Sequence, residues 1–79
     1  MRIHQDQAPH RQRVESSSLT SVGYETGSRT LEVAFRKGGV YRYFGVPASV
    51  HEALMEAPSK GRFFVAQVRD CFPFARVFQ

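Results

Sequence analysis

Residues 31–43 read LEVAFRKGGVYRY, and they predict two antiparallel strands joined by a tight turn. From Thr30 to Phe35, apolar and polar side chains alternate, which is the period of a strand with one buried face. The second strand, Val40–Phe44, is rich in β-branched and aromatic residues. A three-residue loop with Gly38 in the left-handed conformation is a common connection between two such strands.

The register of this hairpin determines on which face of the sheet the two tyrosines lie. A three-residue loop, 36–38, sets Glu32 opposite Arg42, so that opposite charges meet across the strands. A two-residue loop would shift the register by one residue and leave Arg42 among apolar side chains. We therefore choose the three-residue loop, and we expect Tyr41 and Tyr43 to face the core with their hydroxyl groups at its rim.

The chain on both sides of the hairpin extends the sheet. Residues 19–24 predict a first strand, which makes the sheet a three-stranded antiparallel meander. The tail at 74–78 is apolar at alternate positions, so it is a candidate for a short C-terminal edge strand. Residues 1–13 lack apolar periodicity after Ile3, and we interpret them as a flexible N-terminal arm before a single domain, 14–79.

Two helices follow the three strands, so the predicted fold class is α+β, with both helices on one face of the sheet. Val46 suits the N-cap of the first helix and Pro47 its first position, while Pro58 ends it. Ser59 caps a second helix that extends to about Asp70. This helix places three side chains on one apolar stripe: Phe64, Val68 and Cys71.

The composition is that of one small globular domain with a mildly basic surface. The 79 residues carry a formal charge of +4, and half of this excess belongs to the arm. The chain contains one cysteine, and it has no apolar run long enough for a signal peptide or a membrane span. We therefore expect a cytoplasmic protein that does not enter a membrane.

Taken together, these motifs resemble the KTSC family, a short domain found at the C terminus of some lysyl-tRNA synthetases and as free-standing bacterial proteins. The resemblance covers residues 14–78 and implies three strands followed by helices, with RNA binding as the suggested function. The family often carries an asparagine where this chain has Val65. The matching motifs are LxVxF at 31–35, GxYxY at 39–43, VP at 46–47 and SKGxFF at 59–64.

The start of the second helix is the first candidate site, because a helix N-terminus presents unpaired N–H groups and a positive dipole end. After Ser59, Gly61 would let a phosphate approach closely, and Lys60 and Arg62 add positive charge. The same residues also suit a plain helix cap with two solvated cations, and both interpretations stay open. Three further cations would extend the basic patch: Arg36, Lys37 and Arg42.

Two alternative sites use the sheet. Tyr41 and Tyr43 would serve as stacking platforms for bases if they were exposed, although the register argument favours a place in the core. A protein-interaction surface would instead use the outer face of the sheet, where we expect exposed apolar area at three positions: Ala34, Val40 and Phe44.

The sequence predicts no catalytic, metal or cofactor site. Two histidines, His4 and His10, lie in the arm, and His51 stands alone on the first helix, so no metal-ligand spacing exists. Cys71 continues an apolar stripe, which favours a small buried thiol over a nucleophile. We therefore expect a non-catalytic binding domain whose partner is RNA, bound weakly and in a salt-dependent manner, or another anionic ligand. A protein partner is the alternative, and the oligomeric state stays open.

Overall fold

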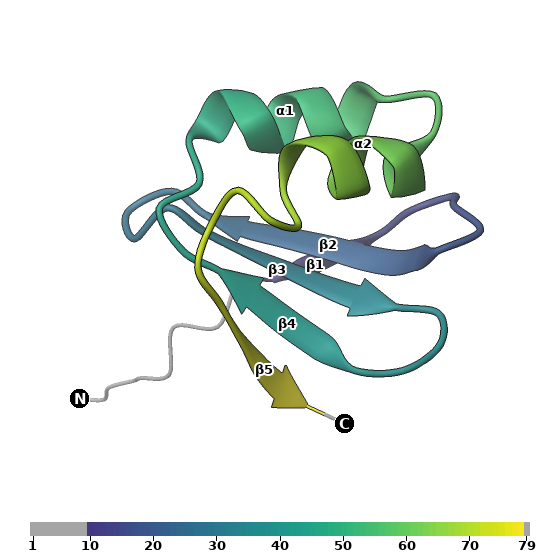
Figure 1. The fold of residues 1–79 in the computed structure, drawn as a ribbon, viewed down its shortest axis with the longest axis horizontal. Coiled ribbons are helices and arrows are strands. Elements are labelled where there is room, and N and C mark those ends of the chain that lie inside the picture. Colours follow the sequence, from purple (N-terminus) through teal and green to yellow (C-terminus); the bar gives the residue numbers. More distant parts are fainter. Residues whose placement is uncertain (1–9, 79) are drawn as a thin grey trace.

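A computed structural model describes residues 10–78 and shows an antiparallel sheet with two helices on one face (Figure 1). The sheet has five strands in sequence order, and the helices α1 (Ala48–Glu56) and α2 (Lys60–Gln67) come between the last two. The α+β class, the central meander and the C-terminal edge strand are confirmed. The strands are β1 (Arg11–Arg13), β2 (Leu19–Glu25), β3 (Thr30–Phe35), β4 (Val40–Tyr43) and β5 (Phe74–Phe78).

The predicted register of the β3–β4 hairpin is confirmed. Glu32 lies opposite Arg42, so the opposite charges pair as the sequence indicates. The turn is closed by two backbone hydrogen bonds: the Phe35 N–H donates to the Gly39 oxygen at 3.1 Å, and the Gly38 N–H donates to the Phe35 oxygen at 2.9 Å. Gly38 has a φ of +117°, which a residue with a Cβ rarely adopts.

The strand β1 corrects the boundary that the sequence predicts for the flexible arm. Its residues belong to the range 1–13, yet they pair with β2 in antiparallel register. Residues 1–9 of that range lie outside the described residues. Local pattern could not reveal β1, because it consists of three polar residues and contributes no apolar side chain to the core.

A buried carboxylate on the outer face of the sheet ties β1 to the strands beyond it. The Glu32 side chain is 4% exposed, and it accepts hydrogen bonds from Arg11 at 2.9 Å and from Arg42 at 2.7 Å. Arg11 lies opposite Gly23. A Cβ on Gly23 would stand 2.8 Å from the His10 oxygen, so glycine lets β1 approach closely enough for this ion pair.

Both helix boundaries differ from the prediction by a few residues. Pro47 is itself the N-cap of α1, and Val46 is buried in the core. The helix α2 begins after Ser59 as predicted, but it ends at Gln67, before the expected Asp70. Cys71 therefore lies in the following turn and is exposed, so the prediction of a buried thiol is wrong.

The core lies between the helices and the inner face of the sheet. Phe64 of α2 is 3% exposed, and its ring meets Phe35 and Tyr43 edge to face at centroid distances of 5.2 and 5.3 Å. Tyr43 is buried and Tyr41 is half-buried on the same face, as the register predicts. The largest fully buried side chains of the described residues are Leu19, Val22, Leu31, Val33, Val46, Leu54 and Val68.

Candidate functional site

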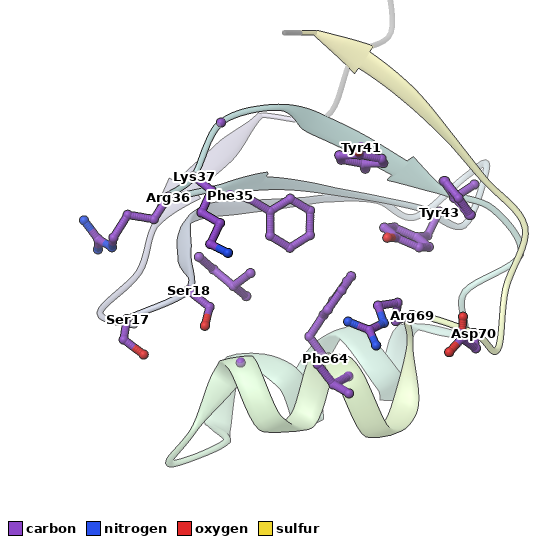
Figure 2. Close-up of a pocket in the computed structure, with 15 residues that line it drawn as sticks. Ser17, Ser18, Phe35, Arg36, Lys37, Tyr41, Tyr43, Phe64, Arg69 and Asp70 are labelled. Atoms are coloured by element: carbon purple, nitrogen blue, oxygen red, sulfur yellow. The ribbon is translucent and has the colours of Figure 1, made fainter.

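A groove of about 620 Å³ lies between α2 and the inner face of the sheet (Figure 2). One wall comes from the β3–β4 hairpin and the start of β5, and the other comes from α2 and the turn that follows it. Ser17 and Ser18, just before β2, line one end. Its volume falls within the range of roughly 300–1,000 Å³ that is typical of ligand sites.

Five of the fifteen residues that line the groove are aromatic. The ring of Tyr41 meets Phe35 edge to face at 5.5 Å, and Phe74 of β5 lies 5.8 Å from Tyr41 and 5.5 Å from Tyr43. Phe74 is 56% exposed, and Val65 on the α2 side is 50% exposed. Two of the three exposed large hydrophobic residues between 10 and 77 therefore lie on this groove.

Cations border the same aromatic surface. Arg36 and Lys37 come from the hairpin, and Arg69 comes from the turn after α2. Figure 2 shows Lys37 and Arg69 pointing into the groove from opposite ends, whereas Arg36 points away from it. The Arg36 guanidinium donates a hydrogen bond to the Ser16 oxygen at 2.8 Å. With Asp70 as the acidic residue of the lining, the groove carries an excess of positive charge.

The Tyr43 hydroxyl stays protonated at neutral pH. Burial raises the pKa of Tyr43 above its usual value of 10.0, and the neighbouring Tyr41 and Asp70 add to this, while Arg69 opposes it. The hydroxyl can therefore donate a hydrogen bond inside the groove.

At the start of α2, the polar groups that the sequence proposes as an anion site already form hydrogen bonds within the protein. The Ser59 hydroxyl oxygen accepts a hydrogen bond from the Arg62 backbone N–H at 3.3 Å, which caps the helix. The Lys60 ammonium donates to the Ala57 oxygen at 3.2 Å. A Cβ on Gly61 would stand 2.8 Å from the Ser18 hydroxyl, so this glycine permits close packing of α2 against the chain before β2.

The structure distributes the predicted site residues over different surfaces. Arg36, Lys37, Gly61 and both tyrosines line the groove, whereas the other residues of the helix start do not. Arg42 belongs to the opposite face of the sheet, where it pairs with Glu32, so it cannot extend a patch around the groove.

The outer face offers less apolar surface than the sequence suggests. Ala34 is buried and Val40 is half-buried, so the expected exposure holds only for Phe44, at 40%. The ion pairs of Glu32 with Arg11 and Arg42 lie on the same face. No observation in this part of the chain therefore favours a broad apolar docking surface there.

Sequence reasoning missed two residues of the groove, Arg69 and Phe74. Arg69 follows the second helix without any motif of its own, and Phe74 was recognised only as part of the candidate edge strand. Phe74 enters the groove because β5 returns beside β4, where it lies opposite Tyr43. Arg69 enters from the turn that follows α2. Within residues 10–78, no group of three histidine, cysteine or acidic side chains could hold a metal ion. Neither helix is long and apolar enough to cross a membrane.

Comparison with known proteins identifies similar chains of known family. The model of the KTSC domain matches residues 15–72. A crystal structure of a KTSC domain protein from Yersinia pestis has a TM-score of 0.86 and 43% identity, and the match covers 89% of this chain and 99% of that one. An uncharacterized protein of Stutzerimonas stutzeri is 51% identical over 51 residues, which are 65% of this chain and 72% of the relative.

Some relatives are much longer proteins. A lysine–tRNA ligase of Nostoc punctiforme is 41% identical over 63 residues, which are 80% of this chain but only 11% of the ligase. A ligase of Trichormus variabilis matches over the same shares at 38% identity. The likeness therefore concerns a small segment of these enzymes.

Proposed function

This chain belongs to the KTSC domain family, and we propose that it is a non-catalytic domain that binds single-stranded RNA in the groove between α2 and the sheet. The phosphates of the strand contact Lys37 and Arg69, with Arg36 nearby at the hairpin. Binding is weak and depends on salt, because few cations are available.

One observation carries this proposal: Lys37 and Arg69 point from opposite ends into a groove whose lining includes aromatic rings. Proteins that bind single-stranded nucleic acids combine positive charge along the backbone with aromatic rings on which bases stack. Positive charge and aromatic rings occur together in this groove.

The relatives favour RNA over other polyanions. Several of them carry the name lysine–tRNA ligase, an enzyme whose name specifies an RNA substrate. A segment that is similar to this chain thus occurs within proteins that act on RNA. A cytoplasmic location remains part of the proposal and agrees with a lone cysteine in the sequence.

The proposal is tested by measuring the affinity for a short labelled single-stranded RNA at several salt concentrations. With about two phosphate contacts, at Lys37 and Arg69, log K should fall with log salt at a slope of roughly −1.4. The double variant Lys37→Ala/Arg69→Ala should weaken binding to all sequences alike and reduce the magnitude of the slope by roughly 1.4.

A second double variant, Lys60→Ala/Arg62→Ala, is the matched control, because it removes the same charge from the start of α2. It should bind RNA nearly as well as the parent chain. A larger loss in this control than in the groove variant would move the site back to the helix start that the sequence indicates. Absence of RNA binding at low salt would reject the proposal and favour a protein partner.

A further inference from the structure

We propose that the groove receives one unpaired base of the bound strand, and that the ring of this base lies against the surface formed by Tyr41 and Phe74. This inference rests on the proposed function and specifies its geometry. Lys37 and Arg69 then lie on either side of the base, where they meet the phosphates that flank it.

The first argument is the exposure of Phe74 in a domain that has few large apolar side chains to spare. More than half of this residue is exposed, although its ring lies within 6 Å of both tyrosine rings. An exposed aromatic side chain that continues a buried aromatic cluster offers a flat apolar surface to a ligand. Val65, also exposed, faces this surface from α2.

The second argument is charge. A purely apolar ligand would leave Lys37 and Arg69 without partners in the groove, and an aliphatic anion would leave the rings unused. A nucleotide unit carries a planar ring and an anionic phosphate in one molecule, so it can contact both the aromatic rings and the two cations. A paired base cannot enter, because in a duplex the ring faces are already stacked and the side chains of the protein cannot reach between them.

The experiment compares three RNA probes of equal length with the full chain: an oligoadenylate strand, the same backbone without bases, and a duplex. The strand should bind at least about fivefold more tightly than the abasic backbone, which is near the lower limit for one stacked base. Adenosine monophosphate should compete poorly, because it lacks the second phosphate contact.

Phe74→Ala separates stacking from charge, since it removes an exposed ring and no cation. It should lower the affinity for oligoadenylate at least about fivefold and leave the affinity for the abasic backbone unchanged. Phe44→Ala is the matched control, because Phe44 is also exposed but does not line the groove. This control should bind all three probes like the parent chain.

Three results would overturn the inference. Equal affinity for the strand and the abasic backbone would exclude base insertion while leaving salt-dependent RNA binding, and thus the proposed function, intact. Adenosine monophosphate that competes as well as the strand would indicate a site for free nucleotides. An oligoglutamate of equal charge that binds as tightly as the strand would indicate an acidic protein partner, and it would reject both proposals.

Discussion

His51 of α1 lies flat against the ring of Tyr24, and this contact links stability to pH. The two rings are stacked with centroids 4.7 Å apart and an angle of 7° between their planes. The Tyr24 hydroxyl donates a hydrogen bond to the Val46 oxygen, which fixes the ring beside the start of α1. The sequence shows His51 only as a lone histidine on the first helix, because its partner is 27 positions away along the chain.

We predict that the domain loses stability as the pH falls below about 6.5. Burial lowers the pKa of His51 below its usual value of 6.5, and Glu52 opposes this only in part. The unfolded chain therefore binds a proton more readily than the folded one, so acidification through this range favours unfolding. The stabilisation from neutral His51 is present above the unfolded pKa and is lost below it.

The measurement is the free energy of unfolding in urea between pH 8 and pH 5 for the parent chain and for His51→Phe. Phenylalanine keeps a ring on Tyr24 but has no titrating group, so the part of the decline caused by His51 should disappear. Parallel curves for the two proteins would show that His51 does not couple folding to pH.

At the scale of elements, the groove lies where α2 packs against the sheet through Phe64 and the residues around it. Phe64 packs against Phe35 and Tyr43, and Gly61 lets the start of the helix contact Ser18. The side chains on the sheet-facing stripe hold α2 in place. Its next residue, Val65, remains exposed on the groove.

Phe64→Ala should lower the free energy of unfolding by about 3–5 kcal/mol, because it removes a buried ring and leaves a cavity. The free energy of unfolding of a small domain can be as low as roughly 5 kcal/mol, so this variant should be largely unfolded at room temperature. Val65→Ala, one position further along α2, should change stability by less than about 0.5 kcal/mol. Circular dichroism during thermal unfolding measures both. A melting temperature near that of the parent would exclude Phe64 from the core.

At the scale of the whole molecule, the two edge strands differ in how they are held. The strand β5 continues the aromatic face of the sheet, whereas β1 depends on backbone pairing and on the ion pair between Arg11 and Glu32. Glu32 also binds Arg42, so this buried carboxylate connects β1, β3 and β4 across the outer face.

Deleting residues 1–13 should therefore leave the fold in place but lower its stability by about 1–3 kcal/mol, the range expected for a lost hydrogen bond to a charged group. Arg11→Ala in the full chain should reproduce much of this loss. Urea unfolding of the two variants provides the comparison. A truncated chain as stable as the parent would show that β1 does not contribute to the stability of the domain.

Local pattern was sufficient for most of the fold. The apolar residues at every second position from Leu31 to Phe35, the charge pairing of Glu32 with Arg42, and the break at Pro58 predict the hairpin, its register and the two helices. These features depend on side chains that are neighbours in the sequence or directly across one turn. Such short-range preferences can be read before the chain is folded.

The groove and β1 were decided only by the tertiary structure. Lys37 and Arg69 are 32 positions apart, and they point into one space because α2 lies across the sheet and β5 then returns beside β4. Similarly, Arg11 reaches Glu32 across a neighbouring strand because Gly23 has no side chain. Contacts between distant segments depend on how whole elements pack. The spacing of residues within one element does not predict that packing.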